Sequence, residues 1–317
     1  METLDALLRY PSPRLRDALW KKITTGDNLF EALREAVGTH SFVNPMEWVR
    51  KWESYASKRD LRPDWEKVEA MVWCAAKIIK NEFDGIINDT RAEETQLPKY
   101  FSTNRDWGVG CIRSLLPDTP LRGKAVYVPV SGWNEKDKTG FLCSLKLEVL
   151  ERGTQKVFHH PKDVFATHPN KDFALSMKDA WEGAKTLAGR EGDVQYDGRW
   201  SLLKGWSQDS RLLDTLKPAN EANNRSASGA AAWGWWFALS GKVPDNRVIV
   251  IAQVDSRKPE CLIGVHDDSV LEKTKTIIQD GGFDTIVVAS RSNKEKVREA
   301  LGSSNQIRIV NLEEKEM

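Results

Sequence analysis

Two segments of this chain contain the residue types that an acyl-transfer site needs. The first, "NNRSASGAAAWGWW" (residues 223–236), places Ser226 and Ser228 where a loop enters a predicted helix. The first N–H groups of a helix have no partner inside it, and with the helix dipole they can stabilise an oxyanion that develops beside a serine. The second, "LEKTKT", supplies Lys273 and Lys275, which are the candidate bases because no histidine is well placed.

Each of these residues also has an ordinary structural explanation. Serine is a preferred helix N-cap, and small residues followed by aromatic residues at helical spacing are typical of a packed core helix. Trp233, Trp236 and Phe237 are three and four residues apart and are predicted to form the buried stripe of that helix. Because residues two positions apart on a helix point to nearly opposite sides, only one of Lys273 and Lys275 can face a serine.

From Ser226 onward the chain resembles the proteolytic domain of Lon-type serine peptidases, which use a Ser–Lys dyad. The family motif Gly-Pro-Ser-Ala-Gly opens a helix of small residues, and it aligns without a gap with "NRSASGAAAWGWWFALSGKVPDNRVIVIAQV" when its serine is placed on Ser226. Downstream, "LIGVHDDSVLEKTKTIIQDGGFDTIVVASRSN" resembles the second conserved element of the family and places the family lysine on Lys273.

The resemblance implies hydrolysis of peptide bonds in a protein substrate, with no cofactor and no metal. Ser226 would be the nucleophile and Lys273 the general base. An ordinary lysine, with a pKa near 10.4, is neutral in only about one molecule in two thousand at pH 7. Burial beside an apolar helix must therefore lower the pKa of Lys273 to roughly 7 to 8, and the neighbouring tryptophans are expected to keep the site dry.

Departures from the family pattern support an alternative interpretation. Arg225 stands where the family has proline, Ser228 stands where it has glycine, and "AQV" (residues 252–254) replaces a threonine-glycine-glutamate sequence. Ser226 and Lys273 are 47 residues apart, which is a few more than the family spacing. The alternative is a catalytically inactive Lon-like scaffold, an interaction protein that keeps the fold without the activity.

Composition and motifs argue against several other classes of function. With 47 basic and 46 acidic side chains, bulk charge recruits neither nucleic acid nor anionic lipid, although the thirteen tryptophans could stack on bases in a nucleic-acid module. The sequence contains no Walker A and no GxGxxG motif. Its longest apolar run is too short to cross a membrane and its first residues lack the pattern of a signal peptide, so a cytoplasmic location is expected.

Metal-ligating residue types are present without a ligand pattern. The segment "FHHPKDVFATHP" (residues 158–169) brings three histidines near Asp163, but their spacing matches no ligand rule. His266, in "VHDD", is interpreted as part of a turn or as an N-terminal helix cap. The cysteines lie far apart and are predicted to be reduced, buried structural thiols. They are Cys74, Cys111, Cys143 and Cys261.

Hydrophobic periodicity divides the chain into two parts. Residues 1–90 repeat apolar positions every three and four residues, which predicts a small all-α helical bundle. Its helices are predicted at residues 11–23, 26–38, 44–58 and 64–83. Residues 91–105 are polar, are interrupted by Pro98 and form the candidate linker. The bundle is expected to be an adaptor that docks on a partner NTPase or sensor protein.

Residues 106–317 are predicted to form an α/β (α+β) domain, and the resemblance implies that its fold is Lon-protease-like. Apolar runs alternate with helical segments, which indicates a sheet covered by helices. The runs 123–132 and 141–153 are predicted to pair as a hairpin. Further strands are predicted at 198–206, 247–254, 261–265, 284–290 and 306–312, and helices at 170–189, 226–239, 268–280 and 293–301. The first of these helices has an apolar stripe of Phe173, Met177, Ala180, Trp181 and Ala184.

Overall fold

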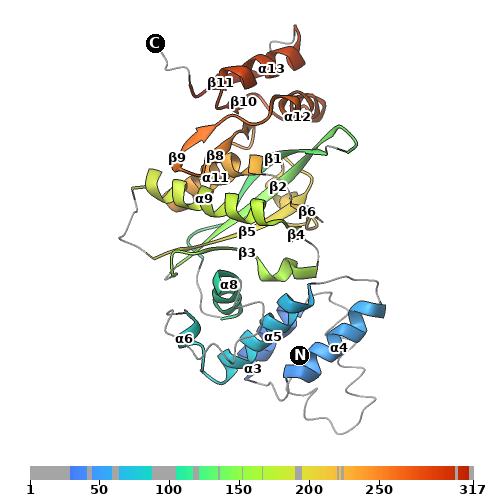
Figure 1. Cartoon of the computed structure of the whole chain (residues 1–317), viewed down its shortest axis with the longest axis vertical. Helices are drawn as coiled ribbons and strands as arrows, with labels where there is room; N and C mark the ends of the chain where they lie inside the picture. The colour runs from blue at the N-terminus through green and yellow to red at the C-terminus, as the bar shows by residue number, and fades with distance from the viewer. Residues whose placement is uncertain are drawn as a thin grey trace. The chain divides into compact units, whose positions relative to one another are not determined.

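A computed structural model describes most of the chain, and its elements are labelled in Figure 1. The described residues are 29–40, 45–58, 64–87, 105–116, 121–134, 136–151, 153–165, 167–189, 195–219, 221–222, 225–303 and 306–313. The chain divides into two compact units, one of residues 1–120 and 158–166 and one of residues 121–157 and 167–317. This division lies later in the chain than the expected linker at 91–105, of which residues 91–104 are outside the described residues.

Apart from residues 158–159, which end the strand β3 (Val157–His159), the described elements of the first unit are helical. They are α3 (Leu29–Thr39), α4 (Pro45–Lys58), α5 (Trp65–Ile79), α6 (Asp84–Ile87), α8 (Arg105–Leu115) and the 3-10 helix η2 (Pro161–Phe165). Helix α5 begins after Asp64, whose side chain accepts a hydrogen bond from the backbone N–H of Lys67 at 3.3 Å. Three of the predicted helices correspond to α3, α4 and α5, while residues 11–23 lie outside the described residues. Docking of this part on a partner NTPase or sensor protein stays a prediction.

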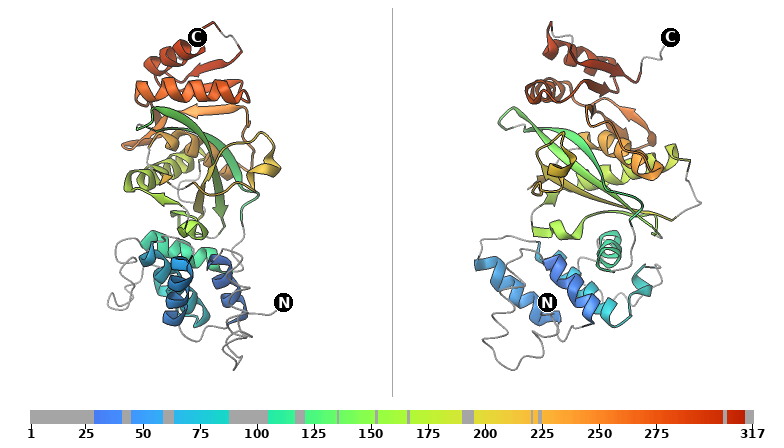
Figure 2. Two further views of the ribbon diagram at one scale, coloured as in Figure 1. Left: turned by 90° about the vertical axis from the view of Figure 1, so that its right-hand side faces the viewer. Right: turned by 180° about the vertical axis from the view of Figure 1, so that it is seen from behind.

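The second unit is built on two main sheets (Figure 2). In the first sheet the strand order is β1-β2-β5-β3, and the hairpin of β1 and β2 is antiparallel as predicted, with Val126 opposite Leu147. The second sheet has the parallel order β11-β10-β7. The strands of the first are β1 (Val126–Asn134), β2 (Thr139–Leu150), β3 (Val157–His159) and β5 (Asp197–Lys204). Those of the second are β7 (Val248–Ile251), β10 (Thr285–Val288) and β11 (Arg308–Asn311).

Two short strand pairs and the remaining helices complete this unit. The pairs are β4 (His168–Pro169) with β6 (Glu221–Ala222) and β8 (Gln253–Asp255) with β9 (Lys258–Ile263). The helices are α9 (Lys171–Leu187), α10 (Ser210–Leu213), η3 (Arg225–Ala227), α11 (Ser228–Ser240), α12 (Asp267–Asp280) and α13 (Arg291–Leu301). Helices and several sheets together make the protein mixed α and β, which is compatible with the predicted α+β class.

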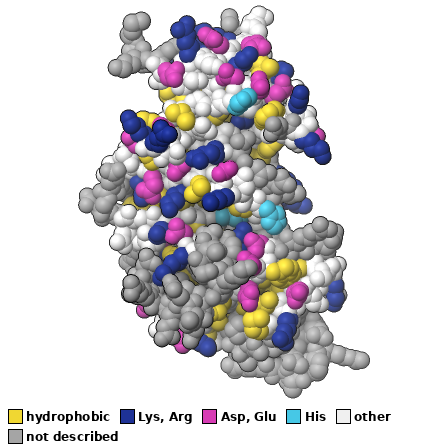
Figure 3. Space-filling view, viewed as in Figure 1, with side chains coloured by type: hydrophobic (Ala, Val, Ile, Leu, Met, Phe, Trp, Pro, Cys, Tyr) yellow, Lys and Arg dark blue, Asp and Glu magenta, His cyan; other side chains and the backbone are white. Residues whose placement is uncertain are grey.

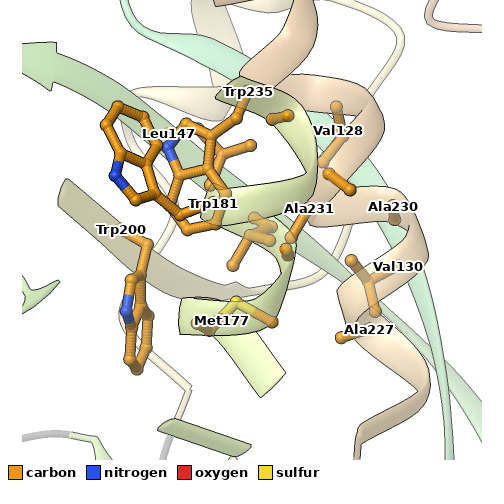
Figure 4. Close-up of a cluster of buried hydrophobic side chains, with 14 of the residues drawn as sticks. Val128, Val130, Leu147, Met177, Trp181, Trp200, Ala227, Ala230, Ala231 and Trp235 are labelled. Atoms are coloured by element: carbon orange, nitrogen blue, oxygen red, sulfur yellow. The ribbon is translucent and has the colours of Figure 1, made fainter. Parts of the chain in front are cut away.

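Helix α9 covers the core of the second unit as its sequence predicts. Asn170 caps its start by accepting a hydrogen bond from the N–H of Phe173 at 2.7 Å. All members of the predicted apolar stripe are buried, so that prediction is confirmed. Figure 4 shows Trp181 and Met177 of α9 facing α11, and Ala227 of η3 and Ala230 and Ala231 of α11 lie near Val128 and Val130 of β1.

The prediction of the buried side of α11 is wrong. Trp235, rather than Trp233, Trp236 and Phe237, is fully buried, and its ring meets that of Trp181 edge to face at 5.5 Å between centroids. Trp233 and Trp236 are only partly buried and pack their rings against Phe237. The helix is apolar on every side and lies between α9 and the strands β1 and β2. Spacing of aromatic residues therefore could not identify the side that faces the core.

Close approach of α9 to β9 depends on Gly183. A Cβ built on this glycine would lie 1.9 Å from the carbonyl oxygen of Pro259. We expect Gly183→Ala to lower the free energy of unfolding by about 1–3 kcal/mol, because the obstacle is backbone and cannot rotate away. Urea denaturation would measure this. The matched control is Gly38→Ala in α3, where a Cβ meets nothing within 4 Å and alanine should stabilise the helix by up to about 1 kcal/mol. A similar gain at Gly183 would refute the close approach.

Candidate active site

The structure brings Ser226 and Lys273 together although they are 47 residues apart in the sequence. The Lys273 Nζ donates a hydrogen bond to Ser226 Oγ at 2.8 Å. Ser226 lies in η3, the single turn before α11, and Lys273 lies in the middle of α12. Lys275, the other candidate base, is about half exposed and forms an ion pair with Glu272 at 2.7 Å. Of the two lysines, only Lys273 contacts the serine.

The sequence of α12 explains why Lys273 points inward. Val270 and Ile277, on the same side of the helix as Lys273, are fully buried, and Lys273 itself is only 1% exposed. The helix begins after His266, which occupies the N-cap position as expected, although its side chain makes no capping hydrogen bond. Asp267 and Asp268 in the first turn interact favourably with the helix dipole.

The start of α12 is bound to α13 by Asn293, a residue that no pattern in the sequence marks as functional. The Asn293 side chain is buried and accepts a hydrogen bond from the N–H of Val265 at 2.9 Å. Its amide nitrogen donates to the carbonyl of Val265 at 2.9 Å and to the Asp267 carboxylate at 2.7 Å. These bonds fix the segment that enters α12 and thereby the direction in which Lys273 projects.

Burial controls the protonation of Lys273. Removing the ammonium group from water disfavours its charged form and lowers the pKa of Lys273 from an ordinary 10.5 to about 8. Because burial is the cause, the amine is neutral in about one molecule in ten at pH 7 rather than one in thousands. The Lys273 amine is thus an available proton acceptor that already contacts a hydroxyl group.

Ser228, the alternative serine, has a different environment. It is buried, its hydroxyl donates to the carbonyl of Arg225 at 2.7 Å, and the same oxygen accepts a hydrogen bond from the N–H of Val254 at 2.9 Å. The Ser228 hydroxyl therefore links the serine turn to strand β8. Neither serine is a side-chain cap of α11, since the N-cap residue is Ala227.

The Arg225 side chain forms an ion pair with a residue of helix α9. Its guanidinium donates to the Asp179 carboxylate at 2.7 Å, and both side chains are partly buried. Burial raises the pKa of Asp179, and the neighbouring Arg225 acts in the opposite direction. No pattern in the sequence indicated this pair, because Asp179 is an ordinary polar position beside the apolar stripe of α9.

The first turn of α11 approaches the backbone that follows β7. The N–H of Gly229 donates to the carbonyl of Ala252 at 3.2 Å, and a Cβ on Gly229 would lie 2.5 Å from that oxygen. Only glycine allows this contact without a shift of the backbone. The Gly229 N–H is therefore occupied by a backbone carbonyl and is not free to bind another acceptor.

The remaining candidate groups do not assemble a second site. Within the described residues no group of three or more His, Cys, Asp or Glu side chains is placed to hold a metal ion. The Nε2 atom of His159 lies 3.7 Å from the Oδ2 atom of Asp163, and both side chains are buried. Cys74, Cys111 and Cys143 are buried as predicted, but Cys261 is exposed because it lies on the two-stranded β8–β9 pair, where solvent reaches its side chain.

On the face shown in Figure 3, basic and acidic side chains of the described residues are interspersed. In the part of the chain that the structure describes, no helix combines the length and the apolarity needed to cross a membrane.

Comparison with known proteins does not identify a family for this chain. The sequence matches no protein-family model and no curated protein. The chemistry of the Ser226–Lys273 pair therefore has to be argued from its contacts and its burial.

Proposed function

We propose that this chain is an ATP-independent, Lon-like serine peptidase that cuts peptide bonds in a protein substrate. The observation that carries the proposal is the hydrogen bond between the buried Lys273 amine and the Ser226 hydroxyl at 2.8 Å. A buried lysine is costly unless it is paired, and pairing usually means a carboxylate. A lysine that is placed instead against a serine, with a lowered pKa, has the arrangement of an activated nucleophile and its base.

The reaction follows from these two side chains. Neutral Lys273 accepts the proton of Ser226 as its Oγ attacks the carbonyl carbon of the peptide. Backbone N–H groups of the Arg225–Ala227 turn stabilise the oxyanion. Protonated Lys273 then gives the proton to the leaving amine, which produces an acyl-enzyme. Lys273 next accepts a proton from a water molecule that attacks the ester, and Ser226 is released with its proton restored.

The substrate is a flexible or partly unfolded segment. The sequence contains no Walker A motif, so the chain has no recognisable module that would unfold a substrate with ATP. A peptide must be extended to enter a site beside a helix start, and a folded protein seldom presents such a segment. The inactive scaffold is the alternative, and hydrolysis of an unstructured substrate distinguishes the two.

The pH dependence of hydrolysis tests the role of Lys273. We expect kcat/KM for casein or an unstructured peptide to rise with pH through an apparent pKa of about 8 and to level off above about pH 9, since neutral Lys273 is the active form. The rate at pH 7 should be roughly a tenth of the plateau. Stopped assays across pH 6–10 would measure the profile, and Lys275→Met should leave it unchanged. A rate that is flat or falls over this range contradicts the proposal, and absence of any hydrolysis favours the scaffold.

A further inference from the structure

The turn that carries Ser226 is held by two elements outside its own helix. From α9, the Asp179 carboxylate binds the guanidinium of Arg225, the residue directly before Ser226. From β8, the N–H of Val254 binds Ser228 Oγ, which in turn donates to the carbonyl of Arg225. Both sets of contacts therefore meet at Arg225, one at its side chain and one at its backbone.

These contacts use Arg225 and Ser228, two of the residues at which the chain departs from the Lon-type motif. A proline at position 225 would restrict the backbone by its ring. Arginine lacks that ring, so its backbone is freer unless other contacts hold it. The ion pair with Asp179 and the bond from Ser228 supply such contacts at the same residue.

We propose that Asp179 and Ser228 are positioning residues, which hold the Arg225–Ala227 turn so that the Ser226 hydroxyl faces Lys273. The inference rests on the proposed peptidase function. Neither residue touches the reacting atoms; each acts through Arg225. A displacement of about 1 Å at a nucleophile can lower a rate by about a hundredfold, so a single lost anchor is enough to matter.

The expected effect separates positioning from substrate binding. Asp179→Asn and Ser228→Ala should each lower kcat by about 10- to 100-fold while KM changes by less than about threefold. Asp179→Glu keeps the carboxylate and should retain most of the rate. The charge-exchanged double variant, Asp179→Arg with Arg225→Asp, should recover activity relative to either single change, because the ion pair is restored in the opposite sense.

A matched control lies on the same helix. Glu182, three residues after Asp179, forms an ion pair with Lys185 at 2.8 Å, and both residues belong to α9. Glu182→Gln removes an ion pair of the same kind without touching the turn, and kcat should stay at the wild-type value. Equal losses in Glu182→Gln and Asp179→Asn would show that α9 is merely destabilised, and would overturn the assignment of Asp179.

A second measurement does not depend on hydrolysis. The pKa of Lys273 in the full chain is measured by NMR with lysine labelled with ¹³C at the ε-carbon, assigned by Lys273→Arg. When the turn is released, water reaches the amine, so its pKa should rise from about 8 toward 10.5 in Asp179→Asn and stay in place in Glu182→Gln. An unchanged pKa together with unchanged kcat overturns the inference. If the wild type hydrolyses nothing, the peptidase function fails, and the pKa alone then decides whether Asp179 holds the turn.

Discussion

Replacing Ser226 with alanine is expected to lower kcat/KM for an unstructured peptide by at least about 10³-fold. The variant keeps the turn and the buried amine but lacks the oxygen that would attack the carbonyl carbon, and loss of a catalytic serine has effects of this size or larger. Peptide cleavage followed by mass spectrometry would measure both the rate and the cleavage position. Thermal unfolding would show that the variant is folded.

Ser256→Ala is the matched control, since Ser256 is exposed in the turn between β8 and β9. Its activity should equal that of the wild type. If Ser226→Ala cuts the peptide at the wild-type rate, Ser226 is not the nucleophile, whatever its contact with Lys273.

Replacing Lys273 with methionine should abolish hydrolysis and at the same time stabilise the fold. Methionine fills a similar space without a proton acceptor, so the loss of activity should equal that of Ser226→Ala. Burial that lowers the pKa from 10.5 to about 8 costs on the order of 3 kcal/mol at pH 7, and the variant no longer has this cost. Urea denaturation would measure the gain, and Lys275→Met, at a half-exposed position, should change neither property.

The pH dependence of that gain has a definite sign. Between pH 8 and 10.5 the unfolded wild-type chain holds more protons at Lys273 than the folded chain, so wild-type stability rises with pH in this window. The advantage of Lys273→Met should therefore be largest below about pH 8 and shrink toward pH 10. An advantage that grows with pH would contradict the burial of a protonatable amine.

The sequence predicted those elements in which apolar residues recur at one regular spacing. The β1–β2 hairpin follows from two apolar runs around a charged turn, and the buried stripe of α9 follows from a helical repeat that is polar elsewhere. Helix α11 lacks this contrast because it is apolar throughout, and so Trp235 could not be recognised as its buried tryptophan. Helix α8 was not predicted, because its first residue, Arg105, ends the polar, proline-containing segment that was expected to be a linker.

Prediction of the candidate site depended on the order of two motifs. Ser226 and Lys273 were identified by their register with a known pattern, and their contact at 2.8 Å required a tertiary arrangement that no local rule contains. The ion pair of Arg225 with Asp179 and the bonds of Asn293 join segments from different elements. Their partners lie 46 and 26 residues away, and side chains of these types are mostly exposed, so nothing in the sequence marked them.

The Asn293 amide also sets a lower limit on the length of a working fragment. The Asn293 side chain, which belongs to α13, bonds to both the N–H and the carbonyl of Val265, as the backbone of a neighbouring strand would. It thereby holds the segment that leads to Lys273. A fragment that ended with α12 would contain both side chains of the Ser226–Lys273 pair but would lose these two bonds, so the segment that enters α12 would no longer be fixed. Helix α13 contributes no atom to the proposed reaction. A shortened protein would nevertheless have to contain it as well as the serine turn.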